Sequence, residues 1–181
     1  MGQTMQTAAA FVESVPEESE RFHQEIALND IHSATVQRGL ALWNRARGDR
    51  RFPARADVTP RMLSDLLRHT TLARVLEDGP DYELRIVGDA LVQMQGRSFQ
   101  GMSLSEIDLV LPGHGSAVRA VYDEVCKRRA PLAVRGWYTR QADKHTVFQE
   151  SLVVPLGNRE GTVDHILAFA TYASSAEDRL R

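Results

Sequence analysis

The chain has 181 residues, of which 43% are hydrophobic and 25% are charged, and its formal net charge is -2 at pH 7. The length suits one domain of about 100–150 residues with additions, and the composition suits a packed core. The near-neutral charge gives no electrostatic case for nucleic acid or an anionic membrane surface, and no apolar run approaches the roughly 20 residues of a membrane span.

The first residues and the cysteine content favour a cytoplasmic protein. The segment MGQTMQTAAAFVESVPEESE has no basic region before an apolar run, so it is a poor secretory signal. The single cysteine, Cys126, excludes an internal disulfide framework, and its place beside an apolar helix face predicts inert burial rather than reactivity.

Residues 1–30 are predicted to form an N-terminal extension that is partly helical. Ser14 and Glu17 have the spacing of a capping box at a helix start. Phe22 and Ile26 follow four residues apart, so they share one face of this predicted helix.

Residues 31–69 are predicted to form helices that flank the core. A helix over residues 30–47, ended by Gly48, carries apolar side chains near one face, namely Ile31, Val36, Leu40 and Trp43. Thr59 followed by Pro60 is a strong helix start, because a capping residue precedes a proline at the first helical position.

The core, residues 70–173, begins with a predicted β-hairpin, and residues 174–181 are left as a tail. Residues 70–77 and the segment from Tyr82 have strand patterns, and the sequence DGP between them is typical of a turn. In the second strand Leu84 and Ile86 alternate with charged residues, as in a half-buried strand.

A glycine-punctuated stretch follows this hairpin and predicts the wall of a pocket. Gly88 ends the strand, and Asp89 is positioned to cap a short helix with apolar surface from Leu91, Val92 and Met94. Two further glycines break the chain again before Ser103 restarts a helix toward Ile107.

A longer helix and three strands complete the core. Ser116 is positioned to cap a helix that runs to about residue 128 and places Val118 and Tyr122 on one apolar face. Strand patterns cover residues 132–139, 146–156 and 165–172. The last of these is apolar on both faces, so we expect it to be covered by the pocket helices on one side. The helix that contains Trp43, or a partner subunit, is the candidate for the other side.

No motif in the chain carries a catalytic or metal site. The segment GRSFQGMS has the glycine spacing of a phosphate loop, but Met102 stands where the lysine is needed. His114 and Ser116 are close in sequence, yet they fit a loop histidine and a capping serine better than a base and a nucleophile. The six histidines show no metal-binding spacing. Arg135 and Glu150 are expected to form a cross-strand pair.

The order of elements and three sequence segments resemble a PAS domain. The order is two helices, two strands, short helices, one longer helix and three strands, and the segments are LALWNRARGDRRFPARADVTP, YELRIVGDALVQMQGRSFQGMSL and FQESLVVPLGNREGTVDHILAF. They are similar to proteobacterial single-domain PAS proteins, and the resemblance covers roughly residues 33–173. It implies an α+β fold in which a five-stranded antiparallel sheet carries the short helices and the longer helix on one face.

The resemblance also implies a cytoplasmic sensor or regulator, rather than an enzyme, that works as a homodimer or through another signalling protein. No kinase, cyclase or DNA-binding segment follows Tyr172, so the expected action is a partner contact or a ligand that changes one. A haem histidine cannot be placed and the flavin-adduct cysteine motif is absent, so the cofactor is left open. The alternatives are a pure dimerisation module with a filled interior and, third, an enzyme of small-molecule metabolism.

Two sets of residues are the candidates for function. The candidate ligand pocket consists of Leu91, Met94, Arg97, Met102, Ile107, His114, Val118 and Tyr122, together with inward residues of the last three strands. Within it, Arg97 is the candidate for contacting an anionic ligand. The candidate dimer or partner interface consists of Phe22, Ile26, Val36, Leu40 and Trp43.

Overall fold

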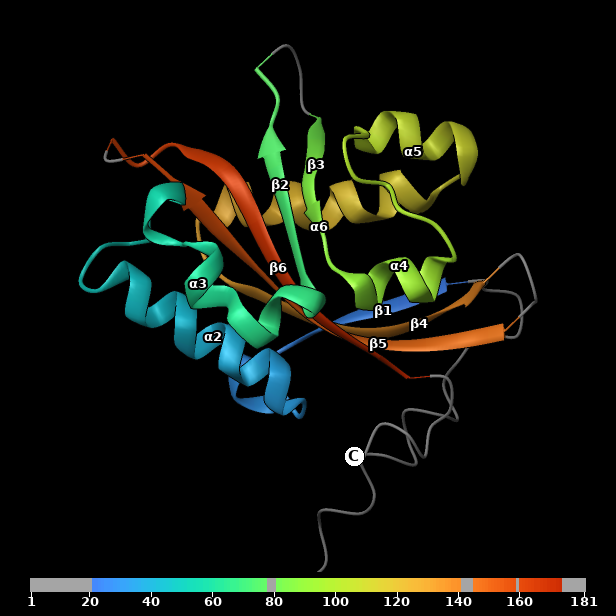
Figure 1. Ribbon diagram of the computed structural model, residues 1–181, viewed down its shortest axis with the longest axis horizontal. Coiled ribbons are helices and arrows are strands. Elements are labelled where there is room, and N and C mark those ends of the chain that lie inside the picture. The colour runs from blue at the N-terminus through green and yellow to red at the C-terminus, as the bar shows by residue number, and fades with distance from the viewer. Residues whose placement is uncertain (1–20, 78–80, 141–144, 159, 174–181) are drawn as a thin grey trace, which may run out of the picture.

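An antiparallel sheet with helices packed on both of its faces makes up the fold (Figure 1). The computed structural model describes residues 21–77, 81–140, 145–158 and 160–173. Within them the sheet has the strand order β1-β4-β5-β6-β2-β3, and neighbouring strands run antiparallel. The strands are β1 (Arg21–Ile26), β2 (Thr70–Val75), β3 (Tyr82–Val87), β4 (Leu132–Arg140), β5 (His145–Gly157) and β6 (Val163–Ala173).

The helices divide between the two faces of the sheet. The first group is α2 (Ala34–Arg47), α3 (Pro60–Leu63) and the 3-10 helix η3 (Ser64–His69). The second group is α4 (Asp89–Gln95), α5 (Leu104–Val110) and α6 (His114–Arg128). Two further 3-10 turns, η1 (Leu28–Asp30) and η2 (Arg55–Asp57), lie in the connections. Within the described ranges, no helix combines the length and the apolar character needed to cross a membrane.

The strand β6 separates two hydrophobic cores, as its sequence predicts. Leu167 and Phe169 face the core under α2, whereas Ile166 and Ala168 face the core under α4, α5 and α6. These four side chains are almost fully buried, because alternate residues of a strand point to opposite faces and both faces are covered. Of the two candidates for the second cover, the chain's own helix α2 occupies that face.

The predicted end of α2 at Gly48 and the predicted start of α3 at Thr59 are confirmed, and Ser33 is an additional cap that the sequence analysis did not predict. The Ser33 side chain accepts a hydrogen bond from the Val36 amide at the start of α2, and Gly48 ends that helix with φ 56°. The helix therefore begins a few residues later than predicted, at its serine cap rather than at residue 30. At α3 the Thr59 side chain accepts from the Met62 amide and Pro60 is the first helical residue, but the continuation to residue 69 is a 3-10 helix.

The prediction of a helix around Phe22 and Ile26 is wrong. Residues 21–26 form β1, which pairs with β4 along its whole length, from Arg21 opposite Tyr138 to Ile26 opposite Ala133. This pairing satisfies the edge of β4 that would otherwise present unpaired backbone groups, and it outweighs the weak helical spacing of two apolar residues. The described sheet therefore has one strand more than the predicted five. Ser14 and Glu17 lie outside the described residues.

Two predicted caps in the pocket wall are also wrong, and one is confirmed. Gly88, not Asp89, is the cap of α4, and Gly113 with φ 77° is the cap of α6, so Ser116 lies inside that helix. The predicted start at Ser103 is confirmed, because its hydroxyl accepts from the Glu106 amide while the Glu106 carboxylate accepts from the Ser103 amide at 2.7 Å. This reciprocal pair satisfies backbone donors that a helix start leaves unpaired.

Candidate ligand-binding cavity

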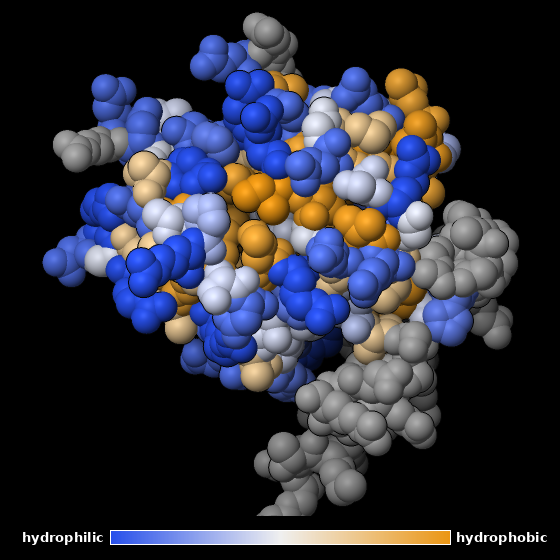
Figure 2. Space-filling model, viewed as in Figure 1, coloured by the Kyte–Doolittle hydropathy of each residue, from blue (hydrophilic) through white to orange (hydrophobic). Residues whose placement is uncertain are grey.

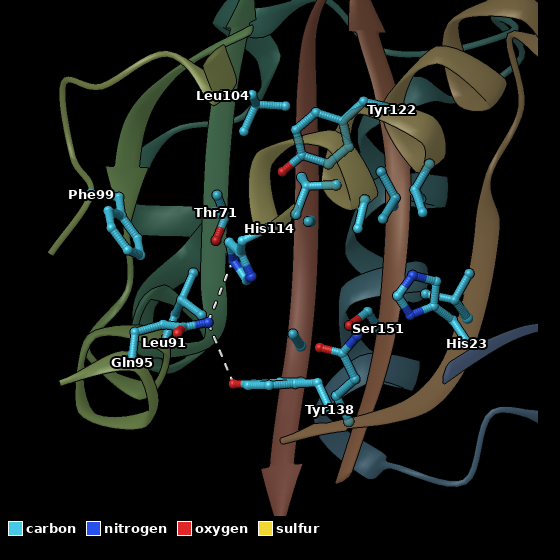
Figure 3. A pocket seen from close by; sticks show the side chains of 18 of the residues that line it. His23, Thr71, Leu91, Gln95, Phe99, Leu104, His114, Tyr122, Tyr138 and Ser151 are labelled. Carbon is cyan, nitrogen blue, oxygen red and sulfur yellow. Dashed lines mark hydrogen bonds between the residues drawn. The ribbon is translucent and has the colours of Figure 1, made fainter. Parts of the chain in front are cut away.

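A cavity of about 120 Å³ lies between the sheet and the helices α4, α5 and α6 (Figure 3). Its floor comes from β4, β5 and β6, with contributions from β1, β2 and β3. The side chains on the sheet side of the cavity are short, because the strand register places small residues next to one another. Ser151 of β5 lies opposite Ala170 of β6, and the next pair on the same face is Val153 with Ala168. Side chains of this size leave a hollow where larger ones would fill the space under the helices.

The three helices supply the roof of the cavity. In α6 the residues His114, Val118 and Tyr122 are four apart, so they lie on the same face of the helix and line the cavity together. Leu91 and Gln95 of α4 have the same spacing, and they line the cavity from the other side. The part of the lining between α4 and α6 comes from α5 and the loop before it, through Leu104, Ile107 and Phe99.

The Gln95 side chain spans two other polar groups of the cavity. Its Nε2 atom lies 3.5 Å from Nε2 of His114 and 3.4 Å from the hydroxyl oxygen of Tyr138 (Figure 3). Both distances are at the long end of the hydrogen-bonding range, so the contacts are weak. The amide can therefore exchange them for a stronger contact with a bound molecule.

The Tyr122 hydroxyl group is able to form a hydrogen bond with a bound molecule. Only 4% of the residue is exposed, and burial raises the pKa of its hydroxyl group, with no other group contributing to the shift. Its ring packs edge-on against Tyr82, with centroids 5.1 Å apart and an interplanar angle of 79°. The hydroxyl group points into the cavity, on the side where Thr71 and His114 lie (Figure 3).

The charged side chains around the cavity point elsewhere. Among its described lining residues there is no Asp, Glu, Lys or Arg, and the polar groups are hydroxyls, amides and imidazoles. They belong to His23, Thr71, Gln95, His114, Tyr122, Tyr138, Gln149, Ser151 and Tyr172. A site of this kind orients a ligand by neutral hydrogen bonds within a mostly apolar wall.

The structure brings together five of the eight predicted pocket residues. Leu91, Ile107, His114, Val118 and Tyr122 line the cavity, and their contact with a ligand stays a prediction. Met94, Arg97 and Met102 are absent from its lining.

The loop between α4 and α5 explains why Arg97 and Met102 lie elsewhere, whereas Met94 belongs to α4 itself. Arg97 is exposed, and its guanidinium group lies 5.2 Å from the centroid of the Phe99 ring. The backbone oxygen of Met102 accepts a hydrogen bond from the Leu84 amide at 2.9 Å, which holds the loop along β3. It is Phe99, not Arg97 or Met102, whose side chain this loop turns inward, with 1% exposure.

Four residues of the predicted interface, Ile26, Val36, Leu40 and Trp43, pack in or against the chain's own core. Val36 is fully buried, and Trp43, which is 3% exposed, donates from its indole Nε1 to the Pro155 oxygen at 2.9 Å. Leu40 and Ile26 are half-buried against the same core, and Phe22 lies in β1. Val36 and Trp43 are thus unavailable as contact residues, because their apolar face covers the sheet. The surface of the molecule over α2 is mainly hydrophilic (Figure 2).

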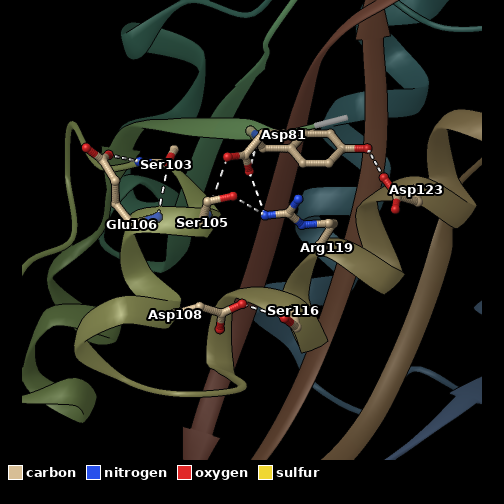
Figure 4. A network of polar contacts seen from close by, with 9 residues as sticks. Asp81, Ser103, Ser105, Glu106, Asp108, Ser116, Arg119 and Asp123 are labelled. Atoms are coloured by element: carbon tan, nitrogen blue, oxygen red, sulfur yellow. Dashed lines mark hydrogen bonds and ion pairs between the residues drawn. The ribbon is translucent and has the colours of Figure 1, made fainter. Parts of the chain in front are cut away.

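A network of polar contacts ties the helical roof to the start of β3 (Figure 4). Arg119 of α6 lies 3.0 Å from the Asp81 carboxylate and donates to the Ser105 hydroxyl at 2.8 Å. Burial works against the charge of Asp81, but hydrogen bonds from Ser105 and the Tyr82 amide and the charge of Arg119 lower its pKa. The Tyr82 hydroxyl donates to Asp123 at 2.7 Å. This side of the roof is therefore firmly attached.

Ser116 belongs to the same outer network, and this separates it from His114. Its hydroxyl donates to the Asp108 carboxylate, while the His114 imidazole lies in the cavity between the rings of Phe99 and Tyr138. The two residues do not converge on one point, as the sequence predicts. Cys126 is half-buried, and burial raises the pKa of its thiol, which disfavours the reactive thiolate. In the described ranges, no three His, Cys, Asp or Glu residues are placed to hold a metal ion.

The predicted pair of Arg135 and Glu150 is confirmed and has a further contact. The two residues are opposite each other on β4 and β5, and Arg135 donates to the Glu150 carboxylate at 2.7 Å. The same carboxylate accepts from the backbone amides of His32 at 3.0 Å and Ser33 at 2.7 Å, just before α2. Glu150 is 8% exposed and lies between Gln149 and Ser151, which line the cavity from the opposite face.

One protein-family model matches this chain. The family model described as "PAS domain" matches residues 31–171, which confirms the resemblance that the sequence predicts. A comparison with curated proteins gave no match.

Similar solved structures include three with light-oxygen-voltage domains. An RNA-binding light-oxygen-voltage receptor is 15% identical with a TM-score of 0.47, over 95% of this chain and 44% of that chain. A light-oxygen-voltage domain studied with a flavin analogue is 15% identical with a TM-score of 0.48, over 66% of this chain and 86% of that chain. The LOV protein of Rhodobacter sphaeroides is 14% identical with a TM-score of 0.45, over 66% of this chain and 72% of that chain. The chain thus spans less than half of the first, and likenesses this distant carry no conclusion about function.

Proposed function

Because the chain belongs to the PAS domain family, whose fold implies a sensory or signalling role, we propose that it is a non-catalytic regulator that binds a small molecule in the cavity. The observation that carries this proposal is the hollow between the sheet and α4–α6, into which the Gln95 amide reaches with only long hydrogen bonds. A filled interior, as a pure dimerisation module would have, needs no such hollow.

The volume of the cavity sets the size of the proposed ligand. It measures about 120 Å³. Pockets for drug-sized ligands span about 300–1,000 Å³, whereas an apolar cavity of about 150 Å³ in another protein binds benzene. The proposed ligand is therefore close to a single six-membered ring in size.

Strand β5 supplies the route by which binding would be passed on. Ser151 and Gln149 line the cavity, and Glu150 between them holds Arg135 and the amides before α2 on the opposite face. A ligand that binds more tightly to one position of β5 than to another shifts the population of those positions, and with them the start of α2. The proposed output is a change in how the chain contacts a signalling partner or a second copy of itself.

The test is whether a small molecule accompanies the purified full-length protein and depends on the cavity. Native mass spectrometry and an absorption spectrum would be recorded for the wild type and for Ala117→Leu, which places a larger side chain among the lining residues. We expect a bound molecule in the wild type and none in the variant. Retention of the same molecule by a folded Ala117→Leu protein would place binding elsewhere, and absence of any bound molecule in a metabolite screen would contradict the proposal.

The partner contact is tested separately by light scattering of the full-length protein. Its support is that Leu109 and Val110, two adjacent large apolar residues at the end of α5, are 83% and 46% exposed. We expect a homodimer whose dissociation is favoured by Leu109→Asp. A monomer at all concentrations would remove the homodimer from the proposal and leave a different partner protein.

A further inference from the structure

We propose that the cavity selects an uncharged aromatic molecule of about one ring that carries a hydrogen-bond acceptor. This inference rests on the proposed function and names the chemical class of its ligand. Three properties of the lining carry it, namely its charge, its aromatic content and the state of its hydrogen-bonding groups.

The absence of fixed charge among the described lining residues selects against ions. No carboxylate, guanidinium or ammonium group lines the cavity, so at a pH where the imidazoles of His23 and His114 are neutral, a charged ligand would lose its water shell without gaining an ionic partner. The nearest basic candidate from the sequence, Arg97, is exposed with its guanidinium group beside the Phe99 ring. The acidic groups of the roof, Asp81 and Asp123, are engaged with Arg119 and Tyr82.

The aromatic rings of the lining favour a flat ligand. Three of the four tyrosines in the chain, Tyr122, Tyr138 and Tyr172, line the cavity. The His114 ring lies between two other rings, with its centroid 6.1 Å from that of Phe99 and 6.4 Å from that of Tyr138. Aromatic pairs gain energy in edge-to-face and offset arrangements at about 4.5–7 Å, so rings on several sides favour another ring among them.

The hydrogen-bonding groups of the lining favour a ligand ring that carries an acceptor. Tyr122 is 4% exposed and its hydroxyl points into the cavity, while burial is the one cause of its raised pKa. A hydroxyl that faces the cavity is free to bond water there, and a ligand oxygen or nitrogen atom takes the place of that water as its acceptor. The Gln95 amide, at 3.4 and 3.5 Å from its neighbours, is a second donor with weak contacts.

Four small probes of one ring size separate these properties in a titration of the full-length protein. Phenol is neutral and carries an acceptor, benzene is neutral without one, benzoate is an anion and benzylammonium is a cation. We expect phenol to bind most tightly, with benzoate and benzylammonium at least about tenfold weaker, as followed by NMR or calorimetry. Equal or tighter binding of either ion would overturn the proposed class and leave ligand binding itself intact.

Two variants test whether the Tyr122 hydroxyl is the group that bonds the acceptor of the ligand. Tyr122→Phe should weaken phenol by about fivefold and leave benzene nearly unchanged, because it removes one neutral hydrogen bond and keeps the ring. Tyr82→Phe is the matched control, since its ring contacts Tyr122 but its hydroxyl bonds Asp123 outside the cavity lining. Unchanged phenol affinity in Tyr122→Phe, or an equal loss in Tyr82→Phe, would overturn the acceptor requirement.

The two proposals fail in different ways. If none of the four probes binds but a molecule copurifies with the wild type and not with Ala117→Leu, the ligand class is wrong and the proposed function stands. If no probe binds and no molecule copurifies, the cavity is a water-filled hollow and both proposals are wrong.

Discussion

Glu150 joins three segments of the chain through one carboxylate. It accepts from Arg135 of β4 and from the amides of His32 and Ser33, and the Arg135 guanidinium also donates to the Asp30 oxygen at 2.6 Å. Charge-assisted hydrogen bonds of this kind are among the stronger polar contacts in proteins, and they leave no surplus charge because the guanidinium group balances the carboxylate. The residue therefore fixes the start of α2 on the sheet.

Replacing Glu150 by Gln should destabilise the protein by about 1–3 kcal/mol, because the amide places a donor where the carboxylate accepts from several donors. The measurement is urea unfolding at neutral pH. Glu83→Gln is the control, since Glu83 also pairs with arginines, Arg74 and Arg85, but both of these are exposed on β3 and its neighbour. A loss in Glu150→Gln no larger than in the control would contradict this role.

Asp81 makes part of the stability dependent on pH. Its pKa is lowered in the folded chain, so it stabilises the fold above its ordinary pKa of 3.8 and loses that contribution as the pH falls further. We expect the unfolding free energy of the wild type to decrease more steeply below about pH 4 than that of Asp81→Asn. Asp49→Asn, at an exposed position, is the control. Parallel curves for the wild type and Asp81→Asn would show that the ion pair with Arg119 does not stabilise the fold.

Close approach between elements explains two glycines that lie inside helices. A Cβ atom at Gly39 of α2 would lie 2.5 Å from the Phe169 ring of β6, and one at Gly115 of α6 would lie 2.0 Å from the Leu104 carbonyl oxygen of α5. Glycine in these places lets α2 approach the sheet and α6 approach α5. The second contact also sets the roof of the cavity, because His114 and Val118 follow the position of α6.

Alanine at Gly115 should destabilise the protein by about 1–3 kcal/mol, even though alanine is the better helix former. The clash is with a backbone carbonyl, which moves only with helix α5. Gly39→Ala is the matched comparison, and we expect a loss of similar size there, because the added methyl group would meet Cγ of the buried Phe169 side chain, which rotation of the ring does not move. Thermal unfolding measures both, and a gain in stability for Gly115→Ala would contradict the close approach.

In the whole molecule, the cavity and α2 lie on opposite faces of one sheet. The strand β5 takes part in both, and its buried residues alternate between the two cores, with Leu152 and Val154 under α2 and Val153 beside the cavity. A displacement of β5 by a ligand therefore reaches both faces. Because polar contacts attach the roof on the α6 side, we expect such a displacement to be directed toward the sheet and α4.

Hydrogen exchange tests this coupling. Phenol at saturating concentration should change the exchange rates of the His32 and Ser33 amides, which bond Glu150, and this change should disappear in Glu150→Gln. The Met62 amide, which bonds the Thr59 hydroxyl at 3.3 Å and not Glu150, is the internal control. Unchanged rates at His32 and Ser33 with phenol bound would separate ligand binding from the start of α2.

Local sequence patterns were sufficient for most of the elements. Strand-like runs located β2, β3 and the three C-terminal strands, with period-two alternation in β3. Thr59-Pro60, Ser103 and Gly48 marked ends of helices, because these signals act within a few neighbouring residues. The doubly apolar strand β6 correctly required cover on both faces. From these features alone, the PAS resemblance and the region of the cavity followed.

Contacts between residues far apart in the sequence determined the remaining features, namely β1, the packing of α2 and the cavity. Residues 21–26 have no strong pattern of their own, and the unpaired edge of β4, more than a hundred residues away, makes them a strand. Whether Val36 and Trp43 faced a partner or the chain's own sheet was likewise open until α2 was packed on β5 and β6. The cavity has the same origin, since Ser151, Ala168 and Ala170 become neighbours only through strand register. The amino-acid sequence thus determined which segments are regular and which of their faces are apolar, and the three-dimensional packing determined what each face meets.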